Sequence, residues 1–414
     1  MTRQYILIYI LAILGCGTKK LIILNKKRKY DIITLNYKEL LIMTNFEKQC
    51  LELLKDDEIM GLNILRTNKD QIIDQFSYGY ADIEKDIPMS INHIHRIASV
   101  SKIFAGLAIL KLIEEKKLDL KEDISKYLGF SFRNPKYPND VITLEMVMTQ
   151  TSSLSDGDEA NGLGYDGVNG RHFFVDLERL ITDPTYEYYT PKTFSDKKPG
   201  TFWEYSNFGC GILACIVEKI TGEYFTNYVK RILFEPLNLD TSFRVEDIKN
   251  KDLIANLYYH TEEGFEIALT KDALLRGQYP RFELGHNFRG PAGGLLVSPN
   301  DLSILMRMLM NKGTYNGVKI FEKESIELME EIHWSGTVEG NIIYRKKGLQ
   351  IVLLDGYSEK TLKGHFGTAY GLRSFMLYND DFGYIFVTNG AKMINLGGIS
   401  DLQQKYLKYL TTLK

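Results

Sequence analysis

Ser99 and Lys102 stand three residues apart at the start of an apolar stretch, IASVSKIFAGLAILKLIEEKKL, which covers residues 97–118. On a helix this spacing places both side chains on one face. A serine hydroxyl is a weak nucleophile until a neighbouring base takes its proton, and a desolvated lysine with a lowered pKa can be that base. The pair could therefore make Ser99 a nucleophile, and the N–H groups of the helix N-terminus would favour an oxyanion beside it.

The stretch after Lys102 predicts a helix in the interior of the protein. It contains no proline, and apolar residues cover nearly its whole circumference at residues 103–110. Charge returns only at residues 114–117, where we expect the helix to emerge into water. A second interpretation stays open, in which Ser99 is simply the N-cap of this helix. Another S-x-x-K match, at Ser195, lies between prolines in a lysine-rich segment and predicts a solvated loop.

Two further patterns contain residue types that suit proton transfer and binding. Tyr205 and Asn207 are two residues apart before a predicted helix, so their side chains point the same way on an extended segment. A tyrosine can relay protons, and an asparagine can hold an amide or a lysine through its two polar atoms. In the segment GHFGT, His365 could act as acid, base or anion partner, and Gly367 lets a ligand or another backbone come close. Each pattern alone is also consistent with packing.

Periodicity predicts the elements that must position these residues. Residues 46–54 have helical spacing, and residues 61–80 predict a hairpin around a turn at 67–70. Further helices are predicted at 143–148, 211–221, 300–311 and 399–413, and further strands at 348–354, 363–368, 372–378 and 384–388. The long loop 152–200 is expected to wall a site. Strands at both ends with helices between them predict one mixed α/β (α+β) domain.

Composition is that of an ordinary globular protein. The chain has 414 residues, of which 44% are hydrophobic and 25% charged, and its net charge is −2. That balance gives no global attraction to nucleic acid, so no nucleic-acid partner is expected. Four cysteines are too few for a disulfide scaffold, and Cys210 and Cys215, in an apolar run, are expected to be buried. No obligate protein partner is evident.

The N-terminus resembles a secretion signal. A ten-residue apolar run ends at ILGC, residues 13–16, which is similar to a bacterial lipobox. On this interpretation Cys16 is lipidated and the protein is an extracytoplasmic, membrane-anchored lipoprotein. The apolar segment 21–24 is unlike a polar tether. The alternative is that residues 1–42 are a spurious or cleaved extension, and a chain that starts at Met43 would be cytoplasmic.

Taken together, the three patterns resemble one family. The motifs at residues 99–102, 205–207 and 365–367 are similar to the S-x-x-K, Y-x-N and K-T-G or H-x-G motifs of the serine β-lactamase and DD-peptidase superfamily. More narrowly, they resemble its class C β-lactamase, esterase and D-aminopeptidase branch. Flanking segments at 143–154, 290–306 and 382–390 also resemble the family. The resemblance covers about residues 46–413.

The resemblance implies an organisation for the chain. It predicts a β-lactamase/transpeptidase-like fold for residues 43–414, in which an antiparallel sheet is flanked by helices. The sheet region would comprise residues 46–98 and 341–414, and a helical lobe, residues 99–340, would be inserted into it.

The resemblance also implies a role for each site residue. Ser99 is the nucleophile that is acylated, Lys102 takes part in its deprotonation, and Tyr205 passes the proton to the leaving group and later activates the deacylating water. Asn207 binds the acyl side chain of the substrate or Lys102. The backbone N–H groups of Ser99 and Thr368, just past Gly367, hold the oxyanion. Whether Lys102 or Tyr205 is the base stays open, because their titrations are coupled.

Two departures from the family pattern bear on these expectations. His365 stands where β-lactamases of this type have a lysine that faces the substrate carboxylate. Histidine is only partly charged at neutral pH, so weaker affinity for anionic β-lactams is expected. The segment QTSSL, residues 150–154, stands where relatives often have H-T-S-G-L, which leaves the conformation of this loop open.

The predicted function is a serine hydrolase, without metal or cofactor, that acts through an acyl-enzyme on small esters, amides or D-amino-acid peptides. Two alternatives stay open: a β-lactamase or D-Ala-D-Ala carboxypeptidase, and a sensor that binds penicillin or a wall peptide without turnover. Metal patterns are weak. His93 and His95 lack a third ligand nearby, and residues 156–162 are offset by one from a calcium loop.

Overall fold

The computed structural model describes residues 20–24, 32–36 and 43–413. The chain forms two compact units, residues 1–56 and 57–414. The lipobox-like segment that ends at Cys16 lies outside the described residues, so the anchoring and localisation hypotheses stay predictions. The predicted domain boundary at residue 43 also stays a prediction.

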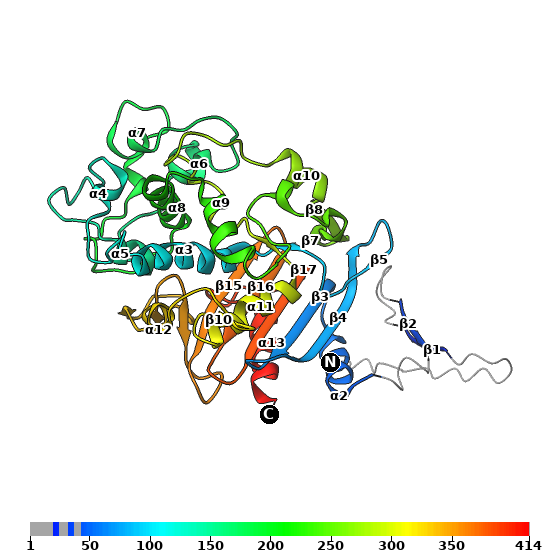
Figure 1. The fold of residues 1–414 in the computed structure, drawn as a ribbon. Helices are drawn as coiled ribbons and strands as arrows, with labels where there is room; N and C mark the ends of the chain where they lie inside the picture. Colours follow the sequence, from blue (N-terminus) through cyan, green and yellow to red (C-terminus); the bar gives the residue numbers. More distant parts are fainter. Residues whose placement is uncertain (1–19, 25–31, 37–42, 414) are drawn as a thin grey trace. The chain divides into compact units, whose positions relative to one another are not determined.

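The first unit contains a hairpin and a helix. β1 (Lys20–Leu24) pairs antiparallel with β2 (Ile32–Asn36). α2 (Asn45–Leu54) follows in the chain (Figure 1). It begins at a capping box, in which Thr44 and Glu47 each accept a hydrogen bond from the other's backbone N–H. In the parts of the chain that the structure describes, no helix combines the length and apolar character that crossing a membrane requires.

The second unit contains one large sheet. Nine strands among the described residues form it, in the spatial order β12-β13-β14-β15-β16-β17-β3-β4-β5 (Figure 1). In that order they are Trp334–Ser335, Lys346–Lys347, Val352–Leu354, Leu362–Ala369, Leu372–Tyr378, Gly383–Ala391, Ile59–Thr67, Ile72–Asp82 and Ile87–Pro88. Every pairing is antiparallel. β3 and β4, from the start of this unit, therefore lie in the same sheet as β15, β16 and β17, from its end. The predicted antiparallel sheet with inserted helices is confirmed.

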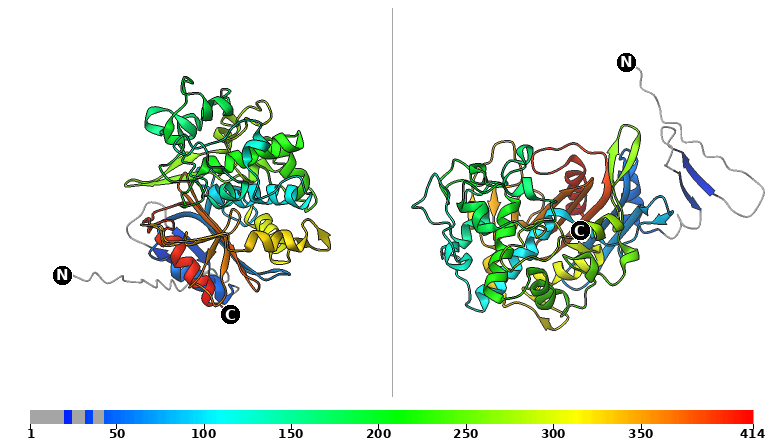
Figure 2. Two further views of the ribbon diagram at one scale, coloured as in Figure 1. Left: turned by 90° about the vertical axis from the view of Figure 1, so that its left-hand side faces the viewer. Right: turned by 90° about the horizontal axis from the view of Figure 1, so that it is seen from above.

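Helices cover the two faces of this sheet. On β17, the ring of Phe386 lies 5.1 Å from the ring of Tyr406 in α13 (Asp401–Thr412). The neighbouring Ile385 and Val387 instead belong to the core that includes α3 and α11. Successive strand residues point to opposite faces, so α13 packs on one face and the larger helical region on the other (Figure 2).

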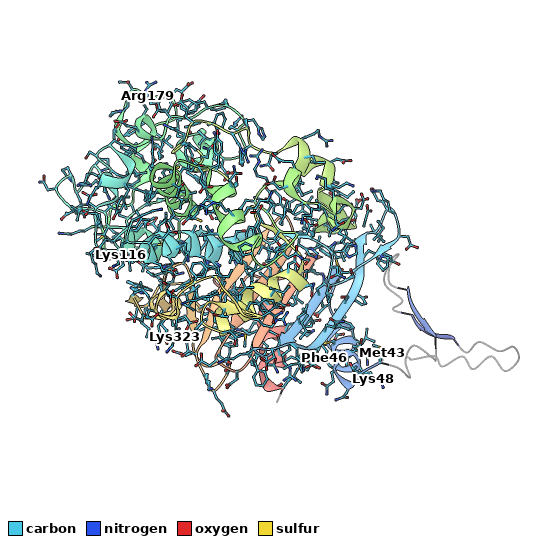
Figure 3. All side chains as sticks on the ribbon, in the orientation of Figure 1. Met43, Phe46, Lys48, Lys116, Arg179 and Lys323 are labelled. Atoms are coloured by element: carbon cyan, nitrogen blue, oxygen red, sulfur yellow. The ribbon has the colours of Figure 1, made fainter. Side chains whose placement is uncertain are left out.

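α3 (Lys102–Glu114) is the buried helix that the sequence predicts. Every residue from 102 to 110 is buried, and exposed charges appear only beyond the last turn, at Glu115, Lys116 and Lys117. Figure 3 shows Lys116 at the surface. The helix contacts β15, α8, α9 and α12. It therefore connects the sheet to the helical region around it, and its first residue lies inside the protein.

The inserted region consists of short elements around α8 (Asn207–Thr221), which packs against α3, α4 and α5. The other helices of this unit are α4 (Ile124–Leu128), α5 (Leu144–Thr149), α6 (Gly164–Val168), α7 (Leu177–Thr182), α9 (Phe225–Val229), α10 (Lys271–Arg276), α11 (Pro299–Met310) and α12 (Lys323–Glu330). Three small ribbons pair β6 (His95–Arg96) with β9 (Leu296–Val297), β7 (Leu257–Thr261) with β8 (Gly264–Leu269), and β10 (Thr314–Tyr315) with β11 (Val318–Lys319).

Two segments differ from prediction. The strand expected at 348–354 is reduced to β14 (Val352–Leu354), because Gln350 has a φ of +60°, which interrupts an extended strand. The segment 152–200 is not a plain loop, since it contains α6 and α7. Its ends pair with each other: Ser155 N donates to Thr193 O at 2.8 Å and Ser195 N to Ser153 O at 2.9 Å.

Leu107→Ala in α3 is expected to lower the free energy of unfolding by about 3 kcal/mol, because the side chain is fully buried and its loss leaves a cavity. Urea unfolding measures this change. The matched control is Leu275→Ala in α10, where the side chain is 39% exposed and a change below about 1 kcal/mol is expected. Equal effects in the two variants would contradict the core position of α3.

Candidate active site

Ser99 lies in a short 3-10 turn, η1 (Ala98–Ser101), that leads directly into α3. Ala98 has a φ of +53°, a left-handed conformation that costs about 1–2 kcal/mol for a residue with a side chain. The surroundings hold this turn in place: Ser374 Oγ of β16 donates a hydrogen bond to Ile97 O at 2.9 Å. The Ser99 side chain forms no capping bond, so the interpretation of Ser99 as a simple N-cap is wrong.

Lys102 points back toward Ser99 and is completely buried. Its Nζ donates hydrogen bonds to Ser99 Oγ at 3.2 Å, Asn207 Oδ1 at 2.8 Å and Ala292 O at 2.9 Å. Burial lowers the pKa of Lys102 to about 8, against the opposing effects of Cys210 and Asp156. A substantial fraction of the amine is therefore neutral near pH 8. The neutral amine has two protons for Asn207 and Ala292, and its lone pair then faces Ser99.

Tyr205 reaches the same serine from the other side. Its hydroxyl donates to Ser99 Oγ at 2.7 Å, and its ring lies 4.8 Å from Lys102 Nζ. Burial raises the pKa of Tyr205, so the phenol keeps its proton at neutral pH. Of the two candidate bases that the sequence leaves open, the directions of the pKa shifts favour Lys102.

Asn207 links the site to Asp156, a carboxylate in the segment that was compared above with a calcium loop. Asp156 accepts hydrogen bonds from Asn207 Nδ2 at 2.9 Å and from Ser206 Oγ at 2.8 Å. It also accepts from the backbone N–H groups of Asn207 and Phe208, at 3.0 and 2.9 Å. Asp156 thereby caps α8 and fixes the amide of Asn207, because only Nδ2 can donate to a carboxylate. The amide oxygen is left to face Lys102.

His365 lies in the same site but makes no hydrogen bond to Ser99, Lys102 or Tyr205. Its ring centroid is 6.4 Å from that of Tyr205. Nδ1 lies 2.6 Å from Phe366 O and must be the donor, because a carbonyl oxygen can only accept. Nε2 is buried and has no partner among the described residues. Burial, with the nearby charges of Lys347 and Lys102, lowers the pKa of His365 well below its usual value, so the ring is neutral at pH 7.

Gly367 brings β15 close to the nucleophile turn. A Cβ at this position would lie 2.5 Å from Ile97 O and 3.4 Å from Ala98 Cβ, so a larger residue would push the strand away. The next residue, Thr368, has an exposed side chain and pairs with Arg373. The backbone at 367–368 therefore lies beside the turn that carries Ser99. The oxyanion role of the Thr368 N–H stays a prediction.

Two side chains from the segment before β14 complete the site, and sequence analysis missed both. The Tyr344 ring lies 5.8 Å from that of Tyr205 and 6.3 Å from that of His365. Lys347 Nζ lies 5.4 Å from the Tyr344 ring. Trp203 stacks on Tyr344 at 4.8 Å. No local motif marks these residues, because the fold brings them to the site from a distant segment.

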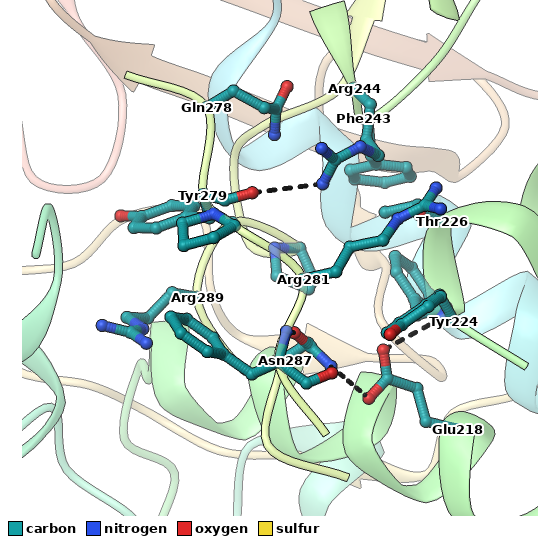
Figure 4. Close-up of a pocket in the computed structure, with 15 residues that line it drawn as sticks. Glu218, Tyr224, Thr226, Phe243, Arg244, Gln278, Tyr279, Arg281, Asn287 and Arg289 are labelled. Carbon is teal, nitrogen blue, oxygen red and sulfur yellow. Dashed lines mark hydrogen bonds between the residues drawn. The ribbon is translucent and has the colours of Figure 1, made fainter. Parts of the chain in front are cut away.

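A separate pocket, drawn in Figure 4, lies between α8 and residues 278–291. Glu218 is its buried carboxylate and accepts hydrogen bonds from Phe225 N, Gly285 N and Asn287 Nδ2. These contacts satisfy the Glu218 carboxyl group within the fold, although burial raises its pKa. None of the predicted site residues lines this pocket.

The weak metal patterns form no metal site. No group of three or more His, Cys, Asp or Glu side chains that could hold a metal ion occurs in the described part of the chain. His93 Nδ1 lies 2.8 Å from Ser90 Oγ, and His95 Nε2 lies 3.4 Å from Asn63 Nδ2. Both histidines are therefore structural.

A model of the β-lactamase family matches residues 46–397. The chain belongs to the β-lactamase family. The resemblance inferred from its three motifs is therefore confirmed.

Among curated relatives of this β-lactamase-family protein is protein flp from Staphylococcus aureus (strain MRSA252), which is 28% identical over 260 residues, 62% of this chain and 47% of flp. An N-acetylmuramyl-L-alanine amidase from Bacillus subtilis (strain 168) is 25% identical over 284 residues, 62% of this chain and 60% of that protein. The chain spans about half the length of the curated relatives it matches.

Solved structures share the fold. An octameric penicillin-binding protein homologue from Pyrococcus abyssi has a TM-score of 0.65 at 23% identity and covers 83% of this chain and 72% of its own. D-amino acid amidase from Ochrobactrum anthropi SV3, complexed with D-phenylalanine, has a TM-score of 0.61 at 18% identity, with coverages of 83% and 89%. EstCE1, a hydrolase with promiscuous acyltransferase activity, has a TM-score of 0.65 at 19% identity, with coverages of 88% and 96%.

Asp156→Ala is expected to lower the free energy of unfolding by about 2 kcal/mol, because four donors at the start of α8 lose their acceptor. Urea unfolding with an unchanged m-value is the measurement. Asp196→Ala is the control, since that side chain is 77% exposed and pairs only at the surface with Lys136; a change within about 0.5 kcal/mol is expected. A comparable loss in both variants would argue against the role of Asp156.

Proposed function

We propose that this protein is a serine hydrolase that cleaves small carboxylic esters or amides, including D-amino-acid peptides, through an acyl-enzyme. One observation carries the proposal: Ser99 Oγ lies within hydrogen-bonding distance of both Lys102 Nζ, at 3.2 Å, and Tyr205 OH, at 2.7 Å. A nucleophile between a base and a proton donor is the arrangement that acyl transfer requires. A D-amino acid amidase and a hydrolase with promiscuous acyltransferase activity among the structures of the same fold agree with this proposal.

In the proposed acylation, neutral Lys102 takes the proton of Ser99 while the serine oxygen attacks the substrate carbonyl. The oxyanion rests on the N–H groups of Ser99 and Thr368, close to the start of α3. Tyr205, still protonated, gives its proton to the leaving group and recovers one from Lys102. Deacylation uses the same groups, with Tyr205 and Lys102 activating a water molecule. Asn207 keeps Lys102 in place throughout.

Three other functions fit the same groups and are distinguished by one set of reagents. A β-lactamase would hydrolyse nitrocefin, and a D-Ala-D-Ala carboxypeptidase would release D-alanine from a wall peptide. A sensor would react once with a fluorescent penicillin and keep the label. Ester turnover without stable labelling supports the proposed hydrolase.

Ser99→Ala is expected to reduce the turnover of a nitrophenyl ester by roughly a thousandfold or more, because no other nucleophile occupies its place. Absorbance of the released nitrophenol measures the rate. Ser195→Ala removes the serine of the other S-x-x-K match and should leave the rate unchanged. Equal activity of Ser99→Ala and the unmodified protein would exclude the proposed mechanism.

The pH dependence of kcat/KM for a neutral ester follows from the pKa of about 8 for Lys102. Below that pH the amine is protonated and cannot accept the proton of Ser99, so the rate should fall about tenfold per pH unit. Above it the rate should reach a plateau. Steady-state kinetics between about pH 6 and 9.5 would show this limb, and a rate that decreases with rising pH over this range would contradict Lys102 as the base.

A further inference from the structure

Lys347 brings a second amine into the site. It lies on β13 and is only 1% exposed. Its Nζ is 5.4 Å from the ring centroid of Tyr344, which in turn neighbours Tyr205 and His365. Burial, together with the charge of Lys102, lowers the pKa of Lys347 to about 7. The amine therefore sits beside the reacting groups and not in a separate part of the core.

Lys347 Nζ lies over the face of the Tyr344 ring but has no oxygen acceptor among the described residues. Lys102 donates to three oxygens, whereas Lys347 Nζ has no hydrogen bond or ion pair with any residue that the structure describes. The adjacent His365 Nε2 is also buried and without a partner. Buried polar groups are rarely left unpaired in native proteins, because each costs free energy. An enclosed amine without an acceptor and an unpaired imidazole nitrogen at one place indicate a ligand that completes them.

The charges around this place favour an anion. Lys102 and Lys347 contribute two amines, and the nearby carboxylate, Asp156, is already shared among four donors at the start of α8. A carboxylate would pair with Lys347 and would favour the protonated form of His365, whose Nε2 would then also donate. No hydrogen bond or ion pair with a described residue holds Lys347 Nζ, which lies over the Tyr344 ring, so the amine has protons to donate to such a group.

We infer that Lys347, with His365 beside it, binds a carboxylate on the leaving-group side of the substrate, so that the preferred esters or amides are anionic. The side follows from Tyr344, whose ring neighbours both Lys347 Nζ and Tyr205, the residue that would protonate the leaving group. This inference rests on the proposed function. It also reverses the expectation that replacing the family's lysine by His365 weakens affinity for anionic substrates, since the charge is supplied from β13.

The test compares phenyl acetate with meta-acetoxybenzoate, which differ only in a carboxylate on the leaving group. The unmodified protein should show a kcat/KM for meta-acetoxybenzoate roughly tenfold or more above that for phenyl acetate. Lys347→Met should abolish most of this ratio. Lys346→Met is the control, because Lys346 is the neighbouring lysine and pairs with Asp355 outside the site; it should keep the ratio. A ratio near one in the unmodified protein, or one retained in Lys347→Met, overturns the inference.

A binding measurement separates this inference from the proposed function. Calorimetric titration of meta-acetoxybenzoate into Ser99→Ala needs no turnover, and adding Lys347→Met should weaken the Kd roughly tenfold or more. The thermal midpoint of Lys347→Met should be equal to or above that of the unmodified protein, because an unpaired buried amine is removed. A large fall would show that the lysine is structural and would overturn the inference. If neither ester is hydrolysed but binding depends on Lys347, the proposed function fails and the anion site stands.

Discussion

The burial of Lys102 without a carboxylate partner is the constraint on which the rest of the site depends. A fully buried ammonium is costly unless every proton finds an acceptor. The three acceptors here come from the η1 turn, from the first residue of α8 and from the backbone at Ala292. These segments are remote in sequence, so the amine is satisfied only when the turn, α8 and the strand-connecting segment have all reached their final positions. The same requirement gives the site one conformation.

The three acceptors of Lys102 are neutral oxygens, and this affects the pKa of the amine. A carboxylate in direct contact would hold the proton on the lysine and raise its pKa, which would remove the base. Asp156 is close enough to order the site but acts through Asn207, whose amide separates the negative charge from the amine. Desolvation therefore remains the larger effect on the pKa of Lys102. The strained left-handed turn at Ala98 belongs to the same arrangement, because it directs Ser99 toward the amine.

The parts of this site that could be predicted from sequence are those for which neighbouring residues form a recognisable pattern. The spacing of Ser99 and Lys102 and the apolar run behind them were sufficient for the interior helix, and alternation was sufficient for most strands. The antiparallel arrangement of the sheet was implied by the family resemblance. Asp156 was not predicted as part of the site, because it caps a helix that begins 51 residues later. The acidic segment around it does not indicate so distant a partner. The effect of Gln350 was missed because one left-handed residue interrupts the predicted strand, although the apolar pattern continues on both sides of it.

Lys347 was not predicted as a site residue for a different reason. A lysine is usually solvated, and no local pattern indicates that this one, on β13, is 1% exposed with its amine over the Tyr344 ring. Its position also shapes what the site can accept. β13 is two strands from β15, and neighbouring strands lie about 4.8 Å apart, so the backbone of Lys347 begins about 10 Å across the sheet from that of His365. The amine of Lys347 therefore reaches the substrate from the side of Tyr344 and not along β15. An anion held by Lys347 consequently lies farther from the nucleophile turn than one held by a lysine at position 365 would. This geometry suits a leaving group with a spacer between its carboxylate and the bond that Ser99 attacks.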